Sequence, residues 1–175
     1  MKRYDTQTLA LCAVLTALAL ALSYMEGMIP IPVPLPGFKL GLANIVTLFA
    51  LDFLGAAPAF IILIARCVLG ALFAGNASAL IFSLIGGVLA LAVMALLRRT
   101  RLLSVYGVSI GGAAAHNLGQ VFAAMITLGT AAPLAYLPAL LIVALFTGAL
   151  TGFITSLLFR AMRNTKMRPK QKGLS

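Results

Sequence analysis

Charged residues are scarce in this chain of 175 residues, and acidic residues are the scarcest of all. Aspartate and glutamate together number 3, histidine occurs once, and tryptophan is absent. Charged residues make up 9% of the sequence, whereas they make up about a quarter of a typical soluble domain. Hydrophobic residues make up 62%, and the mean hydropathy is +1.11. We therefore expect an integral membrane protein embedded in a lipid bilayer.

The shortage of polar residues also excludes several kinds of chemistry. The sequence has no Walker A pattern for ATP, and its acids, Asp5, Glu26 and Asp52, are scattered. It therefore offers neither an aspartate-rich site for Mg²⁺ and diphosphate nor a pair of carboxylates for acid and base catalysis. Cys12 and Cys67 lie in apolar runs without CxxC spacing, which favours two small core residues over a disulfide or metal site. We expect no enzymatic activity, no metal and no cofactor.

Apolar runs of membrane-spanning length dominate the rest of the chain. Short turns rich in glycine and proline separate these runs. We predict one six-helix membrane domain over residues 1–160, followed by a basic cytoplasmic tail over 161–175. The first run is expected to remain as a span and not to be cleaved as a signal peptide. The predicted spans are residues 8–25, 40–55, 57–74, 77–97, 106–128 and 133–160.

Basic residues predict the orientation of these spans. The 13 lysines and arginines give a net charge of +10, but they flank apolar runs, so we expect no nucleic-acid partner. Most of them fall in three clusters: before the first span, after the fourth, and after the sixth. Six spans place all three clusters on one side of the membrane. By the positive-inside rule, both termini are predicted to be cytoplasmic.

The loop between the first two spans is unusually rich in proline. Residues 27–39 read GMIPIPVPLPGFK, in which proline alternates with apolar residues and prevents a regular helix. We expect a semi-rigid lid over the outer end of the bundle, with Pro34 near its centre and with Glu26 and Lys39 at its two ends. Taken singly, Glu26, Lys39 and Asn76 are more typical of solvated interfacial residues.

The segment GGAAAHNLGQ, residues 111–120, places polar side chains at membrane depth, where such groups usually mark a site. Helical spacing places His116, Asn117 and Gln120 on one face about 100° wide. Each alone could be a structural hydrogen-bonding group, but three together favour a pocket wall. Asn44, near the outer end of the second span, is a further candidate for this solute-binding pocket.

Arg66 lies near the middle of the third span, where an unpaired charge is costly. Two interpretations are equally compatible with the sequence. Asp52 could pair with Arg66 across the tight hairpin, or Arg66 could bind a carboxylate or phosphate group of a ligand.

Small residues four positions apart predict helix faces that allow close approach in a membrane. In the fifth and sixth spans, glycines such as Gly119 and Gly148 favour packing inside the bundle. In the first span, Ala13, Ala17 and Ala21 are equally compatible with internal packing and with docking of an external partner.

The runs PGFKLGLANIVTLFAL, residues 36–51, and GGAAAHNLGQ resemble the Gx transporter family, whose members are labelled heptaprenyl diphosphate synthase component I. That family is similar to the substrate-binding S components of energy-coupling factor (ECF) transporters. The resemblance implies a six-helix fold, an outward-facing pocket under the first loop, and a location in a prokaryotic cell membrane. It also implies docking through the alanines of the first helix and, as partners, an ECF transmembrane coupling subunit and two ATP-binding subunits.

Three functions remain open from the sequence. The leading hypothesis is an S component that captures a small vitamin-like or precursor-like solute from outside, with uptake driven by partner ATPases. The alternative is a noncatalytic membrane subunit associated with a heptaprenyl diphosphate synthase. A stand-alone carrier or small channel is the third.

Overall fold

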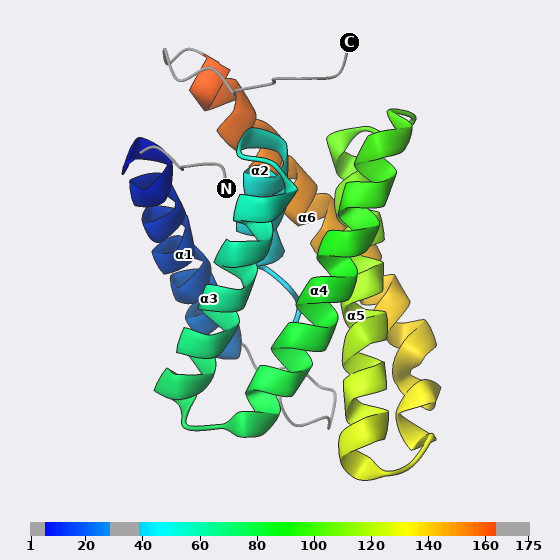
Figure 1. The fold of residues 1–175 in the computed structure, drawn as a ribbon. Coiled ribbons are helices and arrows are strands. Elements are labelled where there is room, and N and C mark those ends of the chain that lie inside the picture. Colours follow the sequence, from blue (N-terminus) through cyan, green and yellow to red (C-terminus); the bar gives the residue numbers. More distant parts are fainter. Residues whose placement is uncertain (1–5, 29–38, 164–175) are drawn as a thin grey trace.

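The computed structural model describes residues 6–28 and 39–163, and within these ranges the chain forms α-helices, one short 3-10 helix and no β-strand (Figure 1). The predicted all-α membrane fold with six helices is confirmed. Pro34 of the predicted lid and residues 164–175 of the predicted tail lie outside the described residues. The elements are α1 (Thr6–Gly27), α2 (Asn44–Phe53), α3 (Ala56–Ala74), α4 (Ala77–Thr100), α5 (Val105–Leu128), η1 (Ala132–Tyr136) and α6 (Leu137–Arg163).

Several of these helices can cross a bilayer. Among the described residues, α1, α3, α4 and the segment Ala132–Ala161 are long and apolar enough to do so. Helix α5 has 24 residues, as α4 has, so at 1.5 Å per residue the two helices have the same length. Unlike α4, it carries the buried polar residues of the 111–120 segment. The chain is therefore a helical membrane protein.

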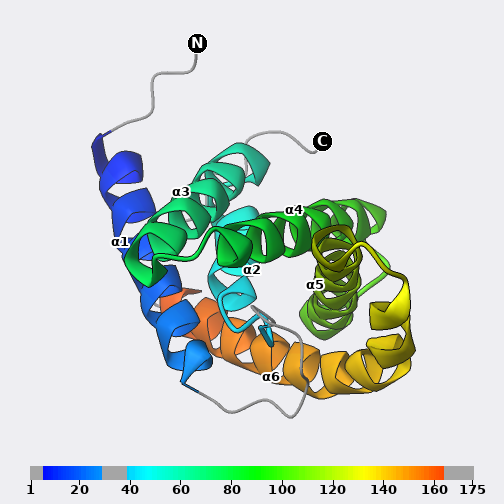
Figure 2. The same cartoon turned by 90° about the horizontal axis from the view of Figure 1, so that it is seen from below.

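The second helix differs from its prediction as a complete span over residues 40–55. With 10 residues, α2 is about 15 Å long, roughly half the thickness of a hydrocarbon core. It contacts every other α-helix and lies in the middle of the bundle (Figure 2). All its residues from Asn44 to Ala50 are buried, as expected for a helix surrounded by protein on all sides. The prediction was wrong about its length because the chain before Asn44 is held in a nonhelical turn.

Glycines allow close approach between α4 and α5 and between α5 and α6. A Cβ atom at Gly119 of α5 would lie 2.8 Å from the Cα atom of Gly86 in α4. A Cβ atom at Gly148 of α6 would lie 2.5 Å from the Cα atom of Ile110 in α5. These distances confirm that the small residues of the fifth and sixth predicted spans pack inside the bundle.

The two ends of the bundle are each named here after one residue. The end at which α1 finishes and α3 meets α4 is here called the Lys39 end, and the opposite end is called the Arg98 end. The first residue of α1 and the last residue of α6 both lie at the Arg98 end (Figure 1). At the Lys39 end, the exposed Asn76 caps α4 by accepting hydrogen bonds from the backbone N–H groups of Ser78 and Ala79. Asn76 is therefore a structural cap.

Asp52 forms its ion pair at the Arg98 end, with Arg98 in the last turn of α4. Both carboxylate oxygens of Asp52 accept hydrogen bonds from this guanidinium group, so the pair ties α2 to α4. The possible pair between Asp52 and Arg66 is thus wrong. Arg66 lies near the middle of α3, whereas Asp52 and Arg98 both lie in the last turns of their helices at the same end.

Candidate functional site

Glu26 holds the segment that leads into α2. Its side chain is 1% exposed, and its carboxylate accepts the backbone N–H of Gly41 at 2.5 Å and that of Leu42 at 3.1 Å. Gly41 has a φ of +87°, which favours glycine and prevents the helix from starting earlier. The interpretation of Glu26 as a solvated residue is wrong, because both carboxylate oxygens are used inside the protein. Glu26, at the end of α1, therefore holds the end of α1 against the turn before α2.

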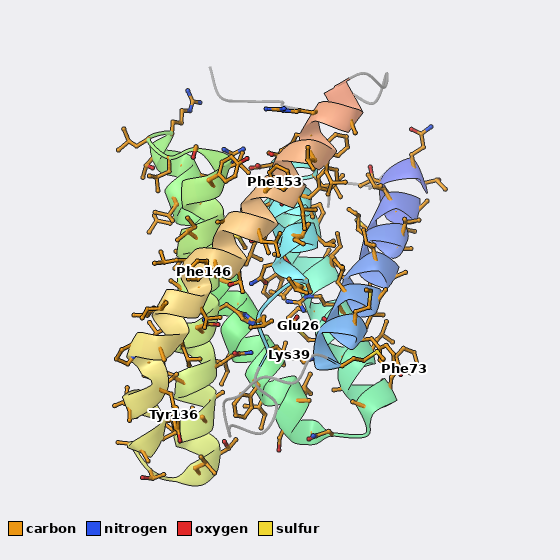
Figure 3. All side chains as sticks on the ribbon, turned by 180° about the vertical axis from the view of Figure 1, so that it is seen from behind. Glu26, Lys39, Phe73, Tyr136, Phe146 and Phe153 are labelled. Atoms are coloured by element: carbon orange, nitrogen blue, oxygen red, sulfur yellow. The ribbon has the colours of Figure 1, made fainter. Side chains whose placement is uncertain are left out.

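Lys39 is half-buried and lies close to Glu26, as Figure 3 shows. Its backbone N–H donates to the Oε1 atom of Gln120 in α5 at 3.4 Å, so the end of the loop contacts the polar segment of α5. Burial lowers the pKa of the Lys39 side chain from its usual range; the Glu26 carboxylate opposes this shift, and the Arg66 guanidinium adds to it. The charges of these three residues therefore interact.

Arg66 of α3 is 5% exposed and incompletely paired. Its Nη1 atom donates to the Oγ atom of Ser23 in α1 at 3.4 Å. Its Nε and Nη2 atoms are buried without a hydrogen-bond partner among the described residues. The Nη2 atom faces α4, since a Cβ atom at Gly87 would lie 3.3 Å away from it. Such buried, unpaired donors are costly, which points to a missing partner.

His116 and Gln120 lie one turn apart on α5 and contact each other. Their Nε2 atoms are 3.2 Å apart, and both residues are at most 2% exposed. The ring of His116 lies beside Gly86 of α4, where a Cβ atom would be 2.9 Å from its Nδ1 atom. On its other side, the ring approaches Gly41, whose Cβ would be 3.0 Å from Cδ2. His116 thus packs between α4 and the turn before α2, and Gln120 lies beside it.

Asn44, the first residue of α2, adds a further unpaired amide. Its side chain is 6% exposed, and neither Oδ1 nor Nδ2 has a hydrogen-bond partner among the described residues. A Cβ atom at Gly41 would lie 2.8 Å from Nδ2, so Asn44 and His116 contact the same glycine. A buried amide without partners is unusual and suits contact with a ligand or an ordered water.

Asn117 does not join this group. Its Nδ2 atom donates to the backbone carbonyl of Leu140 in α6 at 2.7 Å, so it links α5 to α6. Because consecutive helical residues differ by about 100°, Asn117 faces a different helix from His116. The expected convergence of three polar side chains is therefore observed for His116 and Gln120 only.

The structure brings six polar residues from α1, α2, α3, α5 and the turn before α2 to one level of the bundle, and this set is here called the polar cluster. Sequence reasoning missed the contributions of Ser23, Gly86 and Gly87. In the sequence, Gly86 and Gly87 stand out as two adjacent glycines inside an apolar run. In the structure, their lack of side chains lets His116 and Arg66 approach α4. The members of the polar cluster are Glu26, Lys39, Asn44, Arg66, His116 and Gln120.

An open groove between α3 and α4 lies elsewhere, near the Arg98 end. Its lining is apolar apart from one arginine, so it lacks the converging polar groups expected of a solute site. It is lined by Leu51, Ala56, Ala92, Ala95, Leu96 and Arg99.

The alanines of α1 lie on the surface of the bundle. Ala13, Ala17 and Ala21 are all exposed, and among the described residues α1 packs mainly against α2 and α3. No described part of the chain covers this face of α1, so it is exposed to lipid or to another protein.

Comparison with known proteins gives one match. A family model described as heptaprenyl diphosphate synthase component I matches residues 15–158. This range runs from within α1 to within α6 and includes every member of the polar cluster. Neither the curated proteins nor the solved structures gave a match. The match covers most of the chain, so this protein belongs to the heptaprenyl diphosphate synthase component I family.

Proposed function

We propose that this chain is the solute-binding membrane subunit of a transporter of the ECF type. The observation that carries the proposal is the polar cluster, in which Asn44 and Arg66 are buried with hydrogen-bonding atoms that have no partner among the described residues. Soluble or membrane proteins rarely tolerate such groups unless a ligand or water completes their bonding. A small solute with several polar groups would do so.

The described residues at the two ends of the predicted lid, residues 27–39, support its role as a lid. Glu26 precedes it and binds Gly41 and Leu42 after it, so both ends are held together. Lys39 also joins the loop to Gln120 at the polar cluster. The two described ends of the loop are thus tied to α2 and α5, which supports its proposed function as a cover for the bound solute.

The proposed orientation places the Arg98 end in the cytoplasm of a prokaryotic cell. Arg98, Arg99, Arg101 and Arg160 lie at that end, in agreement with the positive-inside rule. The polar cluster, which is nearer the Lys39 end, would then accept solute from outside. Partner ATPases would supply the energy for release on the cytoplasmic side.

The exposed alanine face of α1 is the proposed docking surface for the coupling subunit. In the double variant Ala13→Leu/Ala17→Leu, co-purification of coupling proteins should fall roughly tenfold or more, because bulky side chains prevent close helix approach. The measurement is the amount of partner retained per tagged chain. Thermal stability of the isolated variant should stay unchanged, since both alanines are exposed.

A matched control is available on another exposed surface. In η1 and α6, Ala135 and Ala139 are also four positions apart and exposed. The variant Ala135→Leu/Ala139→Leu should retain normal amounts of partner. Equal loss in both double variants, or no loss in either, would contradict specific docking through α1.

The family match favours a second candidate function, that of a noncatalytic membrane subunit of a heptaprenyl diphosphate synthase. The description of the matched family names such a component, and it supports this function more directly than it supports transport. A soluble prenyltransferase captured with the tagged chain from its native membrane, without coupling proteins, would favour the second function. Capture of a coupling subunit and two ATPases would favour transport.

A further inference from the structure

The polar cluster contains more positive than negative charge. Arg66 and Lys39 provide two basic side chains, whereas Glu26 provides one carboxylate. That carboxylate already accepts hydrogen bonds from two backbone N–H groups, one at each oxygen. No hydrogen bond joins Glu26 to Arg66 among the described residues, and one carboxylate balances only one of the two basic side chains.

Among the described residues, no other acidic residue is placed to balance Arg66. The sequence has three acids, and Asp52 is paired with Arg98. Asp5 is outside the described residues and immediately precedes Thr6, which is 17 residues along α1 from Ser23, about 25 Å at the helical rise. The loop sequence from 29 to 38 contains no aspartate or glutamate. An anion from outside the chain would balance the surplus positive charge.

The unpaired part of Arg66 has the right shape for an anion. Nη1 is occupied by Ser23, while Nε and Nη2 have no partner among the described residues. These two nitrogens form one edge of the planar guanidinium group and point in parallel. Such an edge binds a carboxylate or a phosphate through two hydrogen bonds.

We propose that the bound solute carries a carboxylate or phosphate group that pairs with the Nε and Nη2 edge of Arg66. This inference rests on the proposed solute-binding function and adds the charge class of the solute. Asn44 has a donor and an acceptor without partners among the described residues of the same cluster, and it binds a neutral polar part of that solute. Lys39, at the end of the loop, adds long-range attraction for the anion.

The test uses four small probes that each contain a straight chain of four carbons but differ in the polar group. Butyrate, butyl phosphate, butyramide and butylammonium are added to the purified full-length chain in detergent at constant ionic strength. At about ten times the dissociation constant, a binding anion should raise the thermal midpoint by about 3–5 °C. Whichever of butyrate and butyl phosphate gives this shift identifies the anionic group, and the neutral and cationic probes should give none.

Variants separate binding at Arg66 from general effects of salt. Arg66→Gln should lose the shift, Arg66→Lys should keep part of it, because lysine retains the charge but not the paired edge, and Arg99→Gln, at an exposed position, should keep it fully. If Arg66→Gln does not fold, the Arg66→Lys result decides. The proposal is overturned if neither anion stabilises the chain, if butyramide or butylammonium does so equally, or if Arg66 variants respond as the native chain does.

The same experiment distinguishes this proposal from the proposed transport function. Stabilisation by butyramide alone, in a chain that still co-purifies with coupling proteins, would overturn the anionic assignment and leave solute capture standing. Stabilisation by an anion in a chain that never associates with coupling proteins would support the anion site and contradict transport.

Discussion

Replacing Gly119 with alanine is expected to lower the free energy of unfolding by about 1–3 kcal/mol, because it forces α4 and α5 apart. The new methyl group would lie 2.8 Å from the Cα atom of Gly86 and 2.9 Å from the carbonyl oxygen of Ile85. Both are backbone atoms, so no side-chain rotation can relieve the contact. Since helix association in membranes depends on close packing, a small separation weakens contacts along both helices.

The measurement is unfolding in mixed micelles titrated with a denaturing detergent and followed by helical circular dichroism. Gly70→Ala is the matched control, because its Cβ would lie 3.6 Å from Leu20, an ordinary contact, and alanine favours helix. Its stability should be equal to or above that of the native chain. Gly148→Ala, which meets the Cα atom of Ile110, should be destabilised at least as much as Gly119→Ala. Equal stability of all three variants would contradict this account of the packing.

The second large effect is expected for Glu26→Ala. Removing the carboxylate leaves the N–H groups of Gly41 and Leu42 without their acceptor, and each unsatisfied buried donor costs about 1–3 kcal/mol. It also removes the single negative charge near Arg66 and Lys39. We expect a loss of about 2–4 kcal/mol in the free energy of unfolding, together with easier proteolysis of the loop before α2.

Glu26→Gln tests which part of this effect comes from the second acceptor and the charge. Glutamine keeps one oxygen acceptor, but its amide nitrogen cannot accept from a backbone N–H, so its stability should fall between the native chain and Glu26→Ala. Gly27→Ala, one residue away and with no atom of the described residues within 4 Å of its Cβ, should change stability little. A Glu26→Ala variant as stable as Gly27→Ala would show that the carboxylate does not hold the turn.

Sequence patterns predicted most of the architecture because lipid imposes a simple rule. Backbone groups in a bilayer must be satisfied within the helix, so long apolar runs become helices whatever their neighbours are. The third to sixth helices accordingly begin and end within a few residues of the predicted spans. The second predicted span is the exception. A short helix enclosed by protein is as apolar as a membrane span, so apolar character alone did not reveal that α2 is short.

The candidate site was predictable only in its residue types. Polar residues at membrane depth drew attention to Asn44, Arg66, His116, Asn117 and Gln120 in the sequence. Which of them face one another depends on helix rotation and depth, which spacing within one helix does not encode. Asn117 therefore hydrogen-bonds to α6. Arg66 hydrogen-bonds to Ser23 of α1 and does not pair with Asp52.

The sequence by itself determined that this is an all-α membrane protein with a few buried polar groups and a surplus of positive charge. Tertiary structure alone decided that α2 is short and central and that Glu26 binds the backbone of Gly41 and Leu42. It also decided that one edge of Arg66 has no partner among the described residues. The physical reason is that helix formation is local, whereas the partners of a buried polar group depend on how close neighbouring helices approach. Glycines such as Gly86 and Gly119 set that approach.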